Sequence, residues 1–287
     1  MKKIYLLYFA IFLPFTGISQ DDLLAEIDKK DTVQFAEAAF KGLKIVNLES
    51  TKLAPSRSLY FVVSHRFGSI QGGIREFFGL DQAVTRLHFI YGLSDGWNVG
   101  FSRSSFQKTY DLNTKYRLIR QKIGGSPVTV VGFNGILLNG NLDEALLPNL
   151  EFIDRLGYIS QILISRKFNE RLSLELAPSF FYDNYLPDIS GDQDQMKAQF
   201  SMGIGGRYKL SKRLSLNIDY AAHLNRADNN PFNDPLSIGV DIETGGHVFQ
   251  LHFTNAQPSF ENGFLGQANG SWADGVIFFG FNLSRNF

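Results

Sequence analysis

The chain has 287 residues, enough for one large all-β domain or two smaller domains, and its 28 basic residues balance 28 acidic ones. This balance excludes the basic footprint that nucleic-acid binding needs, so nucleic acid is not expected as a partner. Cysteine is absent, which excludes disulfides, thiolate metal sites and lipoprotein acylation. The mean hydropathy of −0.09 argues against a helical membrane protein but fits a barrel whose strands are half polar.

The first twenty residues have the pattern of a secretory signal peptide. Lys2 and Lys3 form a positive start, an apolar run follows over residues 4–15, and small residues come next. The run is too short to span a bilayer, so a signal peptide is favoured over an N-terminal anchor. We expect cleavage near Ser19 or Gln20.

Residues 21–56 form a charged segment ahead of the main body of the chain. It is expected to be a short helix or a mobile arm, and GLKIVN at 42–47 has the pattern of a short strand. Its mixed charge is compatible with three positions: in a barrel as a plug, along the sheet, or free in the periplasm. The predicted organisation is a signal peptide at 1–20, an arm at 21–56 and a barrel at 57–287.

From residue 57 onward, apolar and polar residues alternate with a period of two. In LSLNIDY at 214–220, for example, leucine, isoleucine and tyrosine point to one face and serine, asparagine and aspartate to the other. The alternation continues to the end of the chain, which is typical of a barrel with one apolar and one polar face. It predicts about twelve strands (range ten to fourteen), near residues 57–67, 83–93, 96–104, 108–120, 126–138, 150–167, 171–182, 196–210, 213–223, 236–243, 247–256 and 275–287.

The predicted connections alternate in length. Even-numbered connections are mostly tight turns, such as SDG at 94–96 and TGG at 244–246, whereas most odd-numbered connections are long. Outer-membrane barrels have short periplasmic turns and long outer loops, while a soluble two-sheet sandwich has no reason to segregate loop lengths. The predicted fold class is therefore all-β, a single closed antiparallel transmembrane β-barrel. The predicted location is the cell outer membrane, with outer-membrane lipid around it.

Several stretches carry a family resemblance. They are FKGLKIVN, LYFVVSHRFG, FGLD, YGLSDGWNVGFSRSSFQKTYDLNTKYRLIRQ and FFGFNLSRNF, and the more specific pieces are SHRFG at 64–68 and GxSRSSFxKTYD at 100–111. Over most of residues 40–287 the chain resembles a Bacteroidota group of outer-membrane barrel proteins of unassigned function. The resemblance implies a single barrel and brings no catalytic residues.

The end of the chain is expected to be the strand that closes the barrel. Its last residue, Phe287, resembles the recognition end that the barrel-assembly machinery of outer membranes reads, so that machinery is expected as a partner. Arg285 departs from the pattern, because an apolar lipid-facing residue would be expected there. At the headgroup rim an arginine costs only about 0–1 kcal/mol.

If the apolar residues face lipid, the charged residues and histidines of the strands face the lumen. Eight-stranded barrels are filled by side chains and sixteen-stranded ones enclose a channel, so about twelve strands leave two alternatives. The lumen is either a narrow path for small solutes, with little preference between anions and cations, or a filled and stable barrel. The lumen-lining candidates carry both signs of charge and are Arg86, His88, Asp111, Lys115, Arg117, Glu175, Arg207, Lys209, Asp219, Asp241, Glu243 and His252.

Catalytic and metal motifs are weak in this sequence. Ser64 and His65 are neighbours on a strand and point to opposite faces, so they cannot act as a nucleophile and its base. His65 and Arg66 are instead expected to tie the first strand to a neighbouring strand or to the arm. No catalytic residue and no cofactor is predicted.

The stretch DISGDQD has acidic residues at a spacing that suits Ca²⁺. The weak candidate ligands are Asp188, Asp192 and Asp194. Gly191 falls at the wrong position for a calcium loop and the distal glutamate is missing, so a solvated loop is favoured and no metal site is predicted.

Three functions remain open. The favoured one is an outer-membrane barrel that passes or binds a small solute of unknown identity. The second is a structural or docking barrel whose long outer loops bind a partner. The third is a barrel enzyme acting on lipids, which would depend on His65, His88 or His252 and is less favoured because no nucleophile motif accompanies them.

Overall fold

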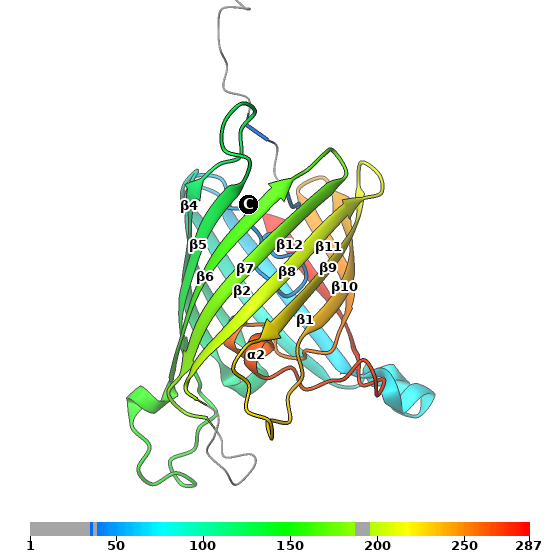
Figure 1. The fold of residues 1–287 in the computed structure, drawn as a ribbon. Coiled ribbons are helices and arrows are strands. Elements are labelled where there is room, and N and C mark those ends of the chain that lie inside the picture. The colour runs from blue at the N-terminus through cyan, green and yellow to red at the C-terminus, as the bar shows by residue number, and fades with distance from the viewer. Residues whose placement is uncertain (1–34, 37–38, 187–195) are drawn as a thin grey trace, which may run out of the picture. The chain divides into compact units, whose positions relative to one another are not determined.

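The computed structural model describes residues 35–36, 39–186 and 196–287. In this part of the chain, twelve antiparallel strands form one closed barrel (Figure 1). They are β1 (Leu59–Ser69), β2 (Ala83–Ser94), β3 (Trp97–Ser104), β4 (Tyr110–Ile119), β5 (Thr129–Leu138), β6 (Leu156–Lys167), β7 (Leu172–Asp183), β8 (Ala198–Lys209), β9 (Leu214–His223), β10 (Leu236–Thr244), β11 (His247–Thr254) and β12 (Phe278–Asn286). The predicted fold class and strand number are confirmed.

Each strand pairs with its neighbours in sequence, and β12 closes the barrel against β1, with His65 opposite Phe281. The largest difference from the predicted strands is the start of β6. Residues 152–155 form a 3-10 helix, η3 (Phe152–Arg155), in which Glu151 and Asp154 cap each other's backbone. Because this cap holds the chain in a helical turn, β6 begins at Leu156.

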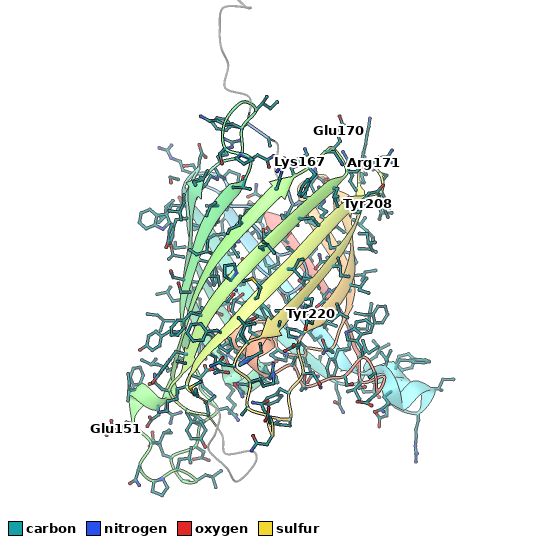
Figure 2. All side chains as sticks on the ribbon, viewed as in Figure 1. Glu151, Lys167, Glu170, Arg171, Tyr208 and Tyr220 are labelled. Carbon is teal, nitrogen blue, oxygen red and sulfur yellow. The ribbon has the colours of Figure 1, made fainter. Side chains whose placement is uncertain are left out.

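The two rims of the barrel differ. The turn rim carries the short connections, such as that between β10 and β11, and lies at the top of Figure 1. The loop rim carries the long connections, two of which contain the 3-10 helices η1 (Ile70–Gly79) and η3. It also carries the short β3–β4 connection, which contains η2 (Phe106–Lys108). Figure 2 shows Glu170 and Arg171 at the turn rim and Glu151 at the loop rim.

The strands bury one face and expose the other. In β9, Ser215, Asn217 and Asp219 are buried inside the barrel, whereas Leu216 and Ile218 are exposed on its outer surface. Outward-facing rings also stack across strands, as Phe67 does on Phe279 at 5.7 Å. A continuous apolar outer surface of this kind belongs against an apolar partner and not against water. No helix among the described residues is long and apolar enough to cross a membrane.

Two segments fold into the barrel and fill its interior. The plug, defined as residues 39–54, enters and leaves by the turn rim: Ala36 bonds Gln121 before it, and Arg57 bonds Gly92 after it. The inner loop, defined as residues 255–268, comes from the loop rim between β11 and β12 and contains the helix α2 (Glu261–Gly266), all of whose residues are buried. Of the three positions considered for the arm, its described part therefore takes the one inside the barrel.

The plug has little regular structure. The short strand predicted at 42–47 is wrong: only one isolated bridge joins Lys44 to Glu49, and the amide of Ile45 bonds the carbonyl of Leu48 to close a tight turn. The plug bonds mainly to the barrel wall, which takes the place of a partner strand.

Candidate functional site

The apolar side of the plug packs into a hollow made by glycines. Ile45 and Leu48 are fully buried against β8, whose inward-facing positions include Gly203 and Gly205. A Cβ at Gly203 would lie 3.0 Å from Leu48, and one at Gly205 would overlap Ile45. These glycines let the plug approach the backbone of the wall closely.

A single carboxylate holds the turn of the plug. Oδ2 of Asp219, on β9, accepts hydrogen bonds from the backbone amides of Val46 at 2.9 Å, Asn47 at 2.7 Å and Leu48 at 3.0 Å. Successive amides that converge on one anion form a nest, so Asp219 satisfies three buried donors at once. Arg66 Nη2 also donates a hydrogen bond to the side-chain oxygen of Asn47, Oδ1, at 2.9 Å.

A buried network of charges joins the plug, the inner loop and the wall. Lys44 of the plug lies 2.9 Å from Glu49 and 2.6 Å from Glu261 of α2, and Lys115 of β4 lies 2.6 Å from Glu49. Arg86 continues the network to Asp111 at 2.9 Å and to Glu261 at 3.5 Å. Lys44 is therefore the link between the segment that enters by the turn rim and the segment that enters by the loop rim.

Glu49 is the centre of this network. Burial by itself would raise the pKa of its carboxyl, but Lys115 and Lys44 oppose burial and hold the pKa of Glu49 well below its usual range. Glu49 is thus ionised at neutral pH. Removal of one partner of such a pair leaves a buried charge uncompensated, which typically costs about 3–5 kcal/mol.

The ion pairs of Glu49 with Lys44 and Lys115 are expected to persist as the pH falls from about 7 to about 5. A carboxyl with a lowered pKa contributes stability that is fully present above its ordinary pKa and is lost as the pH falls toward the lower value. The groups that act most strongly on Glu49 are Lys44, Lys115 and His88, and Arg86, Glu175 and Glu261 also interact with it electrostatically. Hydrogen exchange of the amides in the plug checks this: protection should persist at about pH 5 and decline at about pH 3. Loss of protection at about pH 6 would contradict it.

The structure places the lumen-lining candidates as follows. Arg86, His88, Asp111, Lys115, Glu175, Arg207, Asp219, Asp241 and His252 are buried inside the barrel, and Arg117, Lys209 and Glu243 are half-buried. Most of these groups contact the plug or the inner loop. Glu175 accepts the amide of Thr51 at 3.0 Å, and Glu243 pairs with Lys41 of the plug at 2.8 Å.

The three histidines considered for lipid hydrolysis, His65, His88 and His252, have different surroundings. His65 lies on the outer surface, bonded to Thr85 at 2.8 Å, while Ser64 is buried on the other face as predicted. His88 bonds Asn113 at 3.1 Å, and both ring nitrogens of the buried His252 lack a hydrogen-bond partner. Within the described residues, none of these three rings reaches a serine hydroxyl.

β1 is hydrogen-bonded through His65 and Arg66 to neighbouring strands and to the plug, as the sequence predicts. Arg66 bonds Asn282 of β12 at 3.1 Å as well as Asn47 of the plug, and His65 bonds Thr85 of β2. Sequence reasoning missed Lys44, Glu49 and Glu261. Lys44 and Glu49 are close in sequence, but Glu261 and Lys115, which complete the network, come from distant parts of the chain. The weak calcium candidates Asp188, Asp192 and Asp194, together with the signal peptide, lie outside the described residues.

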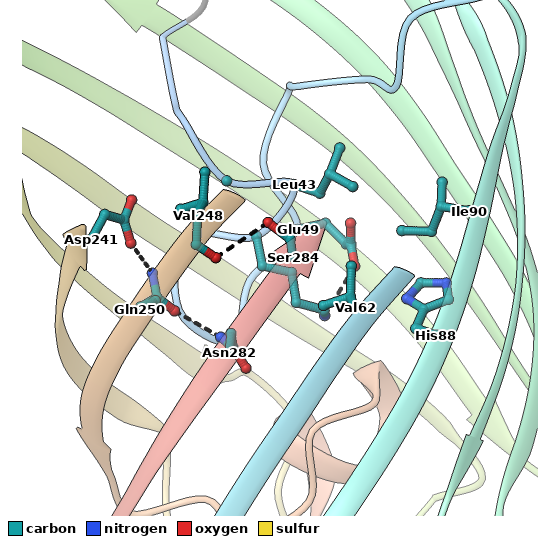
Figure 3. Close-up of a pocket in the computed structure, with 12 residues that line it drawn as sticks. Leu43, Glu49, Val62, His88, Ile90, Asp241, Val248, Gln250, Asn282 and Ser284 are labelled. Atoms are coloured by element: carbon teal, nitrogen blue, oxygen red, sulfur yellow. Dashed lines mark hydrogen bonds and ion pairs between the residues drawn. The ribbon is translucent and has the colours of Figure 1, made fainter. Parts of the chain in front are cut away.

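Some space remains between the plug and the wall near the turn rim. A cavity of about 420 Å³, which includes solvent at its mouth, is lined by the plug and by β1, β2 and β10–β12. Figure 3 shows that Asp241, Gln250 and Asn282 form a hydrogen-bonded row along one side, with Glu49 and His88 on the other. The lining is mixed, because Leu43, Val62, Ile90 and Val248 contribute apolar surface beside these polar groups.

Comparison with known proteins gives a family and a fold. The family model described as "Membrane bound beta barrel domain (DUF5777)" matches residues 40–287. The NanC porin structure is similar to the chain at 11% identity and a TM-score of 0.51, covering 80% of this chain and 98% of that one. An outer membrane channel from Pseudomonas putida F1 matches at 14% identity and a TM-score of 0.45, covering 82% and 97%. A search of curated proteins finds no match. At such low identity, the likeness to NanC shows a porin-like fold alone.

Proposed function

The chain belongs to the DUF5777 family of membrane-bound β-barrel domains, and from this premise we propose that it is an outer-membrane channel for small solutes that its own plug holds closed. The proposed channel is the barrel interior, and the plug and the inner loop are its two barriers. The proposal also places the turn rim in the periplasm, since short turns lie on that side in outer-membrane barrels.

One observation carries the proposal: the lumen is filled by segments that hang from its two rims, and not by the side chains of the wall alone. A purely structural barrel of twelve strands would be expected to fill itself with larger wall residues. Here the wall instead keeps Gly203 and Gly205 where the plug packs, and its polar groups bond the plug. A segment attached at the rim can move without breaking the strand ladder.

The proposal includes two further expectations. One is a signal peptide that is cleaved near Ser19 or Gln20, and the other is contact of Phe287 with the barrel-assembly machinery. Export and assembly are what a barrel in the outer membrane requires. The sequence pattern of residues 1–20 and the terminal aromatic residue support them.

Solute-driven swelling of proteoliposomes tests the channel. Vesicles with the full-length mature protein should swell slowly, and vesicles with a variant lacking the plug should swell several-fold faster in a small solute. Uncharged glycerol, gluconate and arginine should enter at similar rates, because the lumen carries both signs of charge. If neither protein gives swelling above that of empty vesicles, the proposed channel function is wrong, and a docking barrel explains the structure better.

The orientation of the barrel makes a separate prediction about η1. Ile74, Phe77 and Phe78 are exposed on this segment, which projects sideways from the loop rim as the cyan segment in Figure 1. It leaves β1 beside the outward rings of Phe67 and Phe279, so we expect its apolar side chains to enter the membrane interface.

Because the chain lacks cysteine, Phe77→Cys provides a single site for a fluorescent label. In vesicles of brominated lipid, the label at residue 77 should be quenched several-fold more than a label at Asn229→Cys, an exposed position in the loop that follows β9 on the same rim. Equal quenching at the two positions would contradict an interfacial η1.

A further inference from the structure

A second cavity lies at the loop rim, on the other side of the inner loop from the plug. It spans about 390 Å³, including solvent at its mouth, between the rim ends of β5–β7, the β3–β4 connection and the inner loop. We call it the amide cavity because five side-chain amides line it: Gln107, Asn139, Asn184, Asn262 and Gln267.

Asn262 of α2 is the deepest of these amides. Its Nδ2 donates to the carbonyls of Tyr158 and Tyr182, both at 3.3 Å, and to Asp183 at 2.7 Å. Its Oδ1 is buried and has no hydrogen-bond partner in the described part of the chain. A buried acceptor without a partner is unfavourable, so this carbonyl is suited to receive a hydrogen bond from a ligand.

The other amides are each fixed by one bond and keep one polar atom to offer. Gln107 donates to Gln267 at 2.8 Å, which leaves the carbonyl of Gln107 and the NH₂ of Gln267 for a ligand. Asn184 donates to the carbonyl of Leu156 at 2.9 Å and keeps its own carbonyl, while Asn139 accepts the amide of Asn141 and keeps its NH₂. The cavity therefore presents donors and acceptors side by side.

The charged groups at the cavity are occupied within the protein. Arg155 donates to the carbonyl of Leu142 at 2.6 Å and pairs with Glu144 at 3.2 Å. Asp154 accepts the amide of Glu151 at 2.9 Å, and Asp183 accepts Asn262 and Gln199. An ionic ligand would have to displace these bonds, whereas an uncharged one meets the amides directly.

We propose that the amide cavity binds an uncharged polyhydroxylated solute such as a sugar unit. A hydroxyl group donates one hydrogen bond and accepts others, which matches adjacent amide carbonyls and NH₂ groups. Tyr185 and Phe260 line the same cavity and offer ring faces for the apolar face of such a ring.

The site goes beyond the proposed channel and also bears on its opening. Asn262 follows Glu261, whose carboxylate holds Lys44 of the plug at 2.6 Å. A solute bound to Asn262 thus contacts the same short helix that holds the plug. Binding to protein in detergent does not depend on conduction, so failure of the channel and failure of this site are distinguishable.

Isothermal titration calorimetry of the full-length protein tests the site. The probes are glucose, maltotriose and triacetylchitotriose, with gluconate as the charged comparison. We expect at least one uncharged probe to bind and gluconate to bind more weakly. Gln267→Ala and Asn262→Leu should each weaken binding about tenfold, equivalent to about 1.4 kcal/mol.

Asn229→Ala is the matched control, because it removes an exposed amide from another outer loop. Its binding should equal that of the unmodified chain, and the heat-dependent gel shift of each variant reports that the barrel is folded. If Asn262→Leu fails to fold, Gln267→Ala still tests the site, because Gln267 is only half-buried and lies at the edge of the cavity. Three results would overturn the proposal: no binding of any uncharged probe to the folded protein, stronger binding of gluconate, or an equal loss in Asn229→Ala.

Discussion

Deleting residues 21–54 from the mature chain is expected to turn a silent barrel into a steady channel in planar bilayers. The plug enters the lumen from the turn rim and reaches Ser237 and Thr254 at the loop-rim ends of β10 and β11. Its removal also takes Lys44 away from Glu261, so the inner loop loses its central partner. The barrel should persist because β1 begins at Leu59, after the deleted segment, and all its strand pairs remain. The expected change is from closed traces to resolved, long-lived openings.

A second variant and a folding assay serve as controls for this deletion. Replacing residues 256–268 by a flexible glycine–serine linker, in addition, should raise the conductance further if the inner loop is the second barrier. The heat-dependent gel shift shows that each variant is folded. Equal conductance with and without the plug would mean that the plug does not close the lumen. If the folded double variant shows no conductance, the proposed channel function is wrong.

Asp219→Ala is expected to release the plug without removing it. The substitution leaves the amides of Val46, Asn47 and Leu48 without their acceptor, and each buried donor left unsatisfied costs about 1–3 kcal/mol. The substitution therefore weakens the attachment of the plug by several kcal/mol. It should leave the barrel intact, because the strand pairs of β9 are made by its backbone. Single-channel records should then show frequent openings.

Limited digestion with trypsin gives a second measurement of release. Lys41, Lys44 and Lys52 should become cleavable in Asp219→Ala while the strands stay protected. Gly205→Leu should have the same effect for a different reason, because its side chain would overlap Ile45. Asp228→Ala, which removes an exposed carboxylate from the loop after β9, is the control and should leave the plug protected. Release in the control, or protection in both plug variants, would contradict the anchoring role of Asp219.

The strands could be predicted because their signal is local. A residue's side of the sheet depends only on its parity along the strand, so LSLNIDY shows which of its residues turn inward without reference to any other strand. Loop lengths likewise read directly from the chain, and they separate the two rims. The start of β6 was predicted too early, because the cap between Glu151 and Asp154 interrupts an otherwise strand-like stretch.

What fills the barrel could be decided only by the tertiary structure. Residues 39–54 carry only a short strand-like pattern at 42–47, and the structure forms no strand there, so neither their place nor their shape follows from the pattern. Their partners are remote in sequence: Asp219 lies 173 residues after Val46, and Glu261 lies 217 residues after Lys44. By itself, the sequence determined a closed antiparallel barrel with a polar interior and two unequal rims, since alternation and loop length are local properties. The closed barrel alone brings Asp219, Lys115 and Glu261 around one short segment, and so decides that the lumen is plugged.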